Sequence, residues 1–157
     1  MQSAVLSTSA VETYTQLPAQ SVPPRGLSRA RLWTGRVFTA FAGLFLLLDG
    51  FVKVIEIAPV VQGSAELGYP LSTMAPIGIA LLVSTVLYLI PRTAFFGALL
   101  LTGYMGGAIA THVRVLHPLF THTLFPIYVA VLIWAGLALR DQRLAAIVRQ
   151  TFTLRAP

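Results

Sequence analysis

Three ionisable residues lie in and just after an apolar segment of the chain, where charges are rare. Asp49 and Lys53 are four residues apart and Lys53 and Glu56 are three apart, so a helix would place them on one face. Asp49 lies twelve residues beyond Val37, where the apolar segment begins, or about 18 Å along a helix axis. An unpaired charge at that depth in a bilayer costs about 3 kcal/mol or more. Two interpretations stay open: Asp49 is a proton acceptor or ligand anchor in a polar site, or it forms an internal ion pair with Lys53 that orders the helix end.

Three histidines, His112, His117 and His122, follow one another at intervals of five residues. A helix would place Tyr104 two turns before His112 on the same face. Imidazole binds zinc, copper and iron, but this spacing matches no standard helical pair of ligands, and the chain has no cysteine to assist. We therefore expect no metal and no cofactor. We interpret the histidines as interfacial polar groups or, with Arg114, as part of a head-group or substrate pocket.

The composition is that of a membrane protein. Apolar residues make up 56% of the 157 residues and charged residues only 10%, whereas soluble domains have about 25% charged residues. The net charge of +6 sits in short clusters between apolar runs, whereas a nucleic-acid-binding protein would show a basic face or stripe. We expect the chain to contact the lipid bilayer and no nucleic acid. The absence of cysteine excludes disulfides and cysteine-ligated iron–sulfur clusters.

Four apolar stretches predict four transmembrane helices, at about residues 35–55, 74–90, 94–112 and 121–139. Backbone groups in lipid must be satisfied within each segment, and none of the stretches alternates polar and apolar residues as a barrel strand does. The sequence therefore predicts an all-α membrane protein, with a four-helix transmembrane bundle over residues 29–140. Pro126 would kink the last helix if that helix began at Thr121.

The basic residues are distributed unevenly among the connections. Nine of the eleven lie before the first helix, between the second and third, or after the fourth, whereas only Lys53 and Arg114 belong to the other side. The positive-inside rule then places both termini in the cytoplasm. The polar residues described above would meet at the outer end of the bundle. The candidate ligand-binding residues are therefore Asp49, Lys53, Glu56, Tyr104, His112 and Arg114, and the catalytic candidates are Asp49 and His112.

Both tails are predicted to lie in the cytoplasm. Residues 1–28 are polar and rich in Ser, Thr, Gln and Pro, which indicates a disordered tail. Residues 141–157 have apolar side chains at helical spacing, which predicts an amphipathic helix on the inner leaflet. A frayed continuation of the fourth helix is the alternative. The apolar residues of this stripe are Leu144, Ile147, Val148 and Phe152.

The third apolar stretch is rich in glycine. Gly103 and Gly107 are four residues apart, as are Gly106 and Ala110, and such small-residue pairs allow another helix to approach closely. We expect this face to pack within the four-helix unit. A homo-oligomer that forms through the Gly103/Gly107 face is the alternative.

Four stretches of the sequence resemble the DoxX-like family of small bacterial membrane proteins. They are residues 44–53 (LFLLLDGFVK), 66–70 (ELGYP), 89–93 (LIPRT) and 106–120 (GGAIATHVRVLHPLF). The resemblance implies a four-helix unit in the bacterial inner, or cytoplasmic, membrane. The family takes its name from a subunit of a quinone-linked sulfur oxidoreductase. By position, the resemblance points to Asp49, Lys53, His112 and Arg114 as the functional residues.

Three functions are compatible with these observations. The leading hypothesis is an accessory inner-membrane component that binds a lipophilic molecule or a membrane protein partner and has no redox centre of its own. The second is an oxidoreductase subunit or enzyme that acts on a quinone or another hydrophobic substrate, with Asp49 as acid or base and His112 and Arg114 binding the polar end. The third is a proton-coupled transporter, which four short helices could form only as an oligomer.

Overall fold

The computed structural model describes residues 28–141 and, beyond them, Arg143, Leu144, Ala146 and Gln150. Every regular element in this part of the chain is helical. Four helical spans are long and apolar enough to cross a membrane, and they contain the four long helices. These helices are α2 (Arg29–Val54), α4 (Met74–Leu89), α5 (Ala94–Arg114) and α6 (Phe125–Arg140). The predicted all-α, four-helix membrane fold is confirmed.

Three short helical elements lie in the two connections at one end of the bundle. They are α3 (Ala58–Glu66), the 3₁₀ turn η1 (Leu71–Thr73) and the π-helical turn η2 (Leu119–Thr123). We predicted no helix between the first two long helices, whereas the predicted last helix, residues 121–139, includes part of η2. Pro126 falls in the first turn of α6, where a proline needs no hydrogen-bond donor. The chain therefore changes from η2 to α6 just before Pro126, and the proline starts a helix rather than kinking one.

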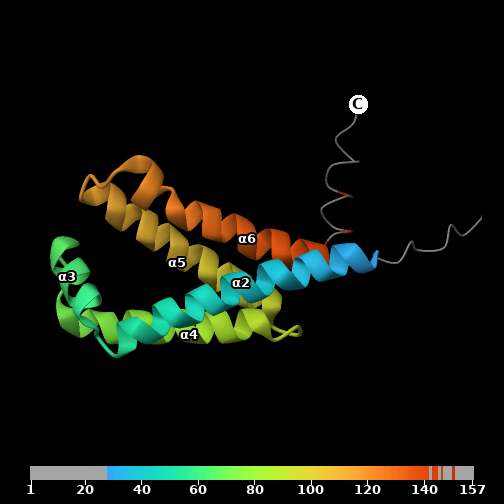
Figure 1. Cartoon of the computed structure of the whole chain (residues 1–157), viewed down its shortest axis with the longest axis horizontal. Coiled ribbons are helices and arrows are strands. Elements are labelled where there is room, and N and C mark those ends of the chain that lie inside the picture. Colours follow the sequence, from blue (N-terminus) through green and yellow to red (C-terminus); the bar gives the residue numbers. More distant parts are fainter. Residues whose placement is uncertain (1–27, 142, 145, 147–149, 151–157) are drawn as a thin grey trace, which may run out of the picture.

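The four long helices form a ring in which each contacts two neighbours. α2 packs on α4 and α6, and α5 completes the ring between α4 and α6. We call the end that carries α3, η1 and η2 the hairpin end, and the end where α2 begins and α6 finishes the terminal end. Figure 1 shows that α2 and α4 run along each other, whereas α5 and α6 spread away from them toward the hairpin end.

Close helix contacts are made by glycines other than those we selected from the sequence. A Cβ atom at Gly97 would lie 2.1 Å from the backbone nitrogen of Tyr88, so only glycine allows α5 to approach α4 there. The α2–α4 crossing likewise depends on Gly78, where a Cβ would lie 2.8 Å from a backbone oxygen of α2.

The expectation that the Gly103/Gly107 face packs within the four-helix unit is wrong. A Cβ atom built at Gly103, Gly106 or Gly107 would meet nothing within 4 Å. The reason is that α5 has already spread away from α4 at this height, while α6 stays beside it (Figure 1). Whether this face joins a second copy of the chain stays a prediction.

Tyr88 closes the core toward the terminal end. Its side chain is completely buried, and its hydroxyl donates to the carbonyl of Ile133 in α6 at 3.0 Å and to Thr39 in α2 at 3.3 Å. Arg140 donates to the backbone carbonyl of Tyr88 at 2.8 Å, and Arg31 donates to a carbonyl near the end of α6. Cations at the C-terminal ends of α4 and α6 satisfy free carbonyls and complement the helix dipoles.

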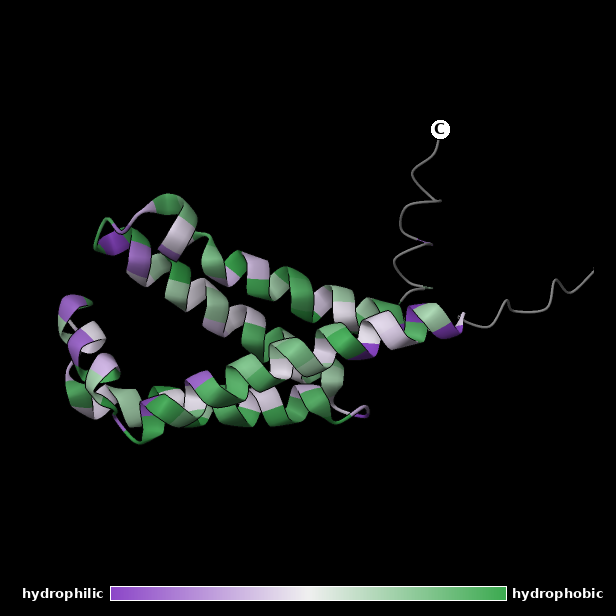
Figure 2. Cartoon of the chain, in the orientation of Figure 1, coloured by the Kyte–Doolittle hydropathy of each residue, from purple (hydrophilic) through white to green (hydrophobic). Residues whose placement is uncertain are grey.

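The surface of the bundle is apolar along the middle of its long helices. Large exposed side chains include Phe41, Leu44 and Leu48 on α2, Val83 on α4, and Phe96 and Leu99 on α5. Figure 2 shows the hydrophilic residues gathered mainly at the two ends and hydrophobic ones between them. An apolar belt of this extent is incompatible with water and is the surface expected of a protein embedded in lipid.

The tail after α6 begins a separate helical segment. Asp141 has extended backbone angles, and its carboxylate accepts from the backbone N–H groups of Arg143 and Leu144, which is the geometry of a helix N-cap. Leu144 packs against the core. The other residues of the predicted amphipathic stripe, Ile147, Val148 and Phe152, lie outside the described residues, as does the predicted disordered tail up to residue 27.

Candidate functional site

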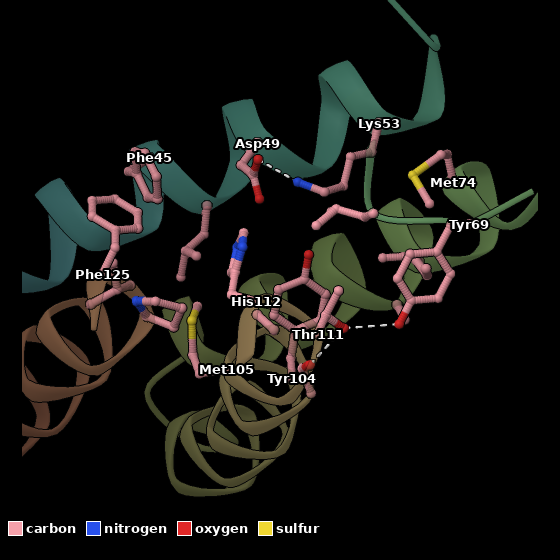
Figure 3. Close-up of a pocket in the computed structure, with 18 residues that line it drawn as sticks. Phe45, Asp49, Lys53, Tyr69, Met74, Tyr104, Met105, Thr111, His112 and Phe125 are labelled. Atoms are coloured by element: carbon pink, nitrogen blue, oxygen red, sulfur yellow. Dashed lines mark hydrogen bonds and ion pairs between the residues drawn. The ribbon is translucent and has the colours of Figure 1, made fainter. Parts of the chain in front are cut away.

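A cavity of about 450 Å³ lies at the hairpin end, between the diverging helices. All four long helices contribute to its wall, together with the connection between α3 and η1. Figure 3 shows polar side chains from α2 and α5 that face one another across it, with Phe45 and Phe125 at one side. The volume falls within the range of about 300–1,000 Å³ that is usual for small-molecule sites.

The α2 wall carries the predicted charged residues. Leu46, Asp49 and Lys53 follow each other at helical spacing and share one face of α2. This face is buried toward the terminal end, and toward the hairpin end it lines the cavity. Lys53 Nζ donates to Asp49 Oδ1 in an ion pair. The side chains remain 32% and 21% exposed for Asp49 and Lys53, respectively, so the pair can be reached from the cavity. Both interpretations from the sequence therefore describe the same residues: Asp49 forms an internal ion pair, and that pair lines a site.

The α5 wall faces this pair. Tyr104, Ala108, Thr111 and His112 recur at intervals of four, three and one residues and occupy one face of the helix. Within the described part of the chain, the Tyr104 hydroxyl has no hydrogen-bond partner, and only the Nδ1 atom of the His112 ring has one. The second carboxylate oxygen of Asp49 is likewise without a partner there. The cavity thus holds three polar groups that are free to bind a ligand.

A strap made of residues 67–70 covers the cavity beside α5. The Tyr69 hydroxyl and Thr111 Oγ1 are 2.9 Å apart, and Arg114 donates to the backbone carbonyl of Leu67. The Arg114 guanidinium also lies over the Tyr69 ring, 5.8 Å from its centroid. Gly68 has a φ of +68°, a conformation that glycine adopts without strain. The strap ties the end of α5 to the α3 connection.

The three histidines form a cluster at the edge of the site. Their ring centroids lie 5.0 to 5.9 Å apart, and the Nδ1 atoms of His112 and His117 are 2.9 Å apart. Of the three, only His112 lines the cavity. In the part of the chain that the structure describes, no three His, Asp or Glu side chains are arranged so that they could hold one metal ion.

The structure brings four of the six candidate ligand-binding residues into the cavity: Asp49, Lys53, Tyr104 and His112. Glu56 and Arg114 do not line it. Glu56 follows the end of α2 and has a φ of +51°, so it leaves the helical register on which its predicted position depended. Arg114 instead holds the strap.

Sequence reasoning missed Tyr69, Thr111 and the apolar part of the wall. Thr111 could have been found, because it lies seven residues after Tyr104 and therefore on its face. Tyr69 had no such signal, since its place depends on how the strap folds back onto α5. The apolar wall includes Met74 and Met105, whose flexible thioether side chains adapt to ligands of differing shape.

Comparison with known families gives one match. The DoxX-like family matches residues 37–136, which include all four long helices except the first turns of α2 and the last turn of α6. Comparison with curated proteins and with solved structures gave no match.

Proposed function

The chain belongs to the DoxX-like family, and we propose that it is a membrane component that binds an amphiphilic molecule in the cavity at its hairpin end. One observation carries this proposal. Free hydrogen-bonding groups of Asp49, Tyr104 and His112 converge in a cavity whose remaining wall is largely apolar. A few convergent polar groups in an apolar pocket are what fixes the orientation of a small ligand.

The charges of the site favour a polar but uncharged head group. Asp49 and Lys53 form a pair whose net charge is zero, and neither Glu56 nor Arg114 lines the cavity. Asp49 can accept a hydrogen bond through its second oxygen, whereas Lys53 and Tyr104 can donate one. A head group with both a donor and an acceptor, such as a hydroxyl or a carbonyl beside a hydroxyl, matches these partners.

The ion pair also favours binding over acid–base catalysis. A general base must be free to accept a proton, whereas one carboxylate oxygen of Asp49 already accepts a hydrogen bond from Lys53 Nζ. Asp49 is therefore better suited to orient a ligand than to exchange protons with it. An enzymatic role on a quinone or a similar molecule would need His112 to carry the proton.

The test is mass spectrometry of lipophilic compounds retained by the full chain after purification in mild detergent. We expect wild type to retain a defined compound and Asp49→Asn to retain about tenfold less, because a hydrogen bond to a charged group is worth about 1.5–3 kcal/mol. Glu56→Gln is the matched control, since it removes a carboxylate just outside the cavity. Tyr104→Phe is a second variant that leaves the ion pair intact. The proposal is contradicted if wild type retains only bulk lipid. It is also contradicted if Asp49→Asn and Tyr104→Phe each retain as much of the compound as wild type does.

We further propose that the terminal end faces the cytoplasm and the hairpin end faces outward across the inner membrane. The distribution of basic residues supports this orientation. The chain has no cysteine, so single cysteines can be labelled without background. In intact cells, Gln62→Cys in α3 should react with a membrane-impermeant maleimide. Arg92→Cys, between α4 and α5, should react only after permeabilisation, and the opposite pattern would reverse the orientation.

A further inference from the structure

A second hollow lies beside the cavity, between α2 and α6. This groove has a volume of about 240 Å³, and it is lined by apolar and aromatic residues, among them Phe41, Phe45, Phe125, Tyr128 and Leu132. It is smaller than the usual ligand site of about 300 Å³ or more. The groove is therefore suited to hold a part of a ligand whose remainder lies elsewhere.

The groove and the cavity share a wall. Phe45, Phe125 and Val129 line both hollows. The rings of Phe45 and Phe125 meet edge to face, with centroids 5.6 Å apart, so one ring from α2 and one from α6 stand at the boundary. Figure 3 shows this ring pair at the side of the cavity, close to Asp49 and His112.

Neither ring is locked in the core. Phe45 is 37% exposed and Phe125 is 44% exposed, whereas Val129 beneath them is buried. Exposed side chains change rotamer readily, and the two rings meet edge to face rather than stacked face to face. Both rings can therefore change orientation at the boundary between the two hollows.

The groove opens to the lipid and runs toward the middle of the membrane. Phe41 is 66% exposed on the apolar belt of α2. It lies eight residues before Asp49, which is about 12 Å along the helix toward the terminal end. A molecule with its head at Asp49 would thus have its chain directed to the bilayer centre, which is the orientation that an amphiphile already has in lipid.

Resting on the proposed function, we propose that Phe45 and Phe125 form a lateral gate and that the ligand is an amphiphile with one hydrocarbon chain. The uncharged head binds in the cavity, and the chain passes between the two rings into the groove. The ligand therefore comes from the bilayer through the side of the bundle, between α2 and α6. During this entry its hydrocarbon chain contacts either lipid or the apolar side chains of the groove.

Photolabelling of the full chain in lipid nanodiscs tests this gate. One probe is dodecylphenol with a diazirine at the end of its chain, and the other is a phenol with the diazirine on the ring and no chain. A diazirine labels the residues next to it, so the short probe should label the cavity wall and the long probe should label Phe41, Tyr128 or Leu132 in the groove. An excess of unlabelled dodecylphenol should suppress the labelling in each hollow.

Phe45→Trp narrows the gate, and Phe125→Trp does so from the other helix. Each should lower groove labelling by the long probe about tenfold relative to cavity labelling of the same variant by the short probe, the factor that corresponds to lost burial of about two methylene groups. Phe51→Trp is the matched control, since Phe51 is an exposed residue of α2 that lines neither hollow. We expect it to change nothing.

The outcomes separate the two proposals. Cavity labelling by the short probe without groove labelling by the long probe, or groove labelling that both tryptophan variants leave intact, overturns the gate and retains the cavity. Failure of the short probe to label the cavity of wild type overturns the binding function and the gate with it. Groove labelling that responds to Phe45→Trp and Phe125→Trp, but not to Phe51→Trp, supports both.

Discussion

The glycines of α5 lie in two opposite environments. Gly97, in the first half, lies against the backbone of Tyr88 so closely that a Cβ atom would be 2.1 Å from it. Gly103, at the middle of the helix, and Gly106 and Gly107, in the second half, face open space. The first half builds the core and the second half borders the cavity, although a glycine-rich pattern would suggest the reverse.

The difference shows what glycine does at each position. At Gly97 the missing side chain lets two helices touch at the point where the chain has just turned from α4 into α5. In the second half the missing side chains leave α5 without close packing, and Gly107 borders the ligand cavity together with Tyr104 and His112. α5 therefore packs closely on α4 near Gly97 and lies apart from it toward the hairpin end (Figure 1). This divergence opens the bundle at the hairpin end.

Replacing Gly97 with alanine tests this comparison most severely. Overpacking costs about 1–3 kcal/mol in ordinary cores and more where the backbone must move. Because the contact is with backbone atoms, we expect Gly97→Ala to lower the free energy of unfolding by about 3 kcal/mol or more. Unfolding in mixed detergent micelles, followed by circular dichroism, measures this change.

Gly106→Ala is the matched control on the same helix. Its Cβ would meet nothing, and alanine favours a helix over glycine, so we expect the free energy of unfolding to stay within about 1 kcal/mol of wild type. Equal destabilisation by the two substitutions would show that both halves of α5 are packed alike.

A smaller effect is expected from removing one hydroxyl in each region. Tyr88→Phe deletes the donor to the Ile133 carbonyl and to Thr39, which should lower the free energy of unfolding by about 1 kcal/mol. Tyr104→Phe removes a hydroxyl that has no partner among the described residues, so its effect on stability should be below about 0.5 kcal/mol. The same unfolding measurement compares both, and a larger loss for Tyr104→Phe would mean that its hydroxyl is bonded within the protein.

The sequence was sufficient for the fold because lipid leaves few alternatives. Long apolar runs must form helices in a bilayer, so the four long helices and the family could both be recognised from the chain. The Asp49–Lys53 pair was also predictable, since both residues lie on one helix at a fixed spacing.

The rest of the site depends on contacts between distant segments. Tyr69 reaches Thr111 only because the strap folds across the end of α5, and no periodicity in the sequence encodes that path. Glu56 was misplaced because α2 ends two residues before it. The spacing of the glycines also does not show which of them contact another helix, because that depends on the direction in which each helix runs.

The Asp49–Lys53 pair has a consequence for membrane insertion. Both charges belong to α2 and lie one helical turn apart, so the pair can form as soon as that helix does. α2 therefore carries its own counter-ion into the hydrocarbon and needs no partner helix to neutralise it there. The most polar part of the site is in this way independent of the order in which the helices assemble.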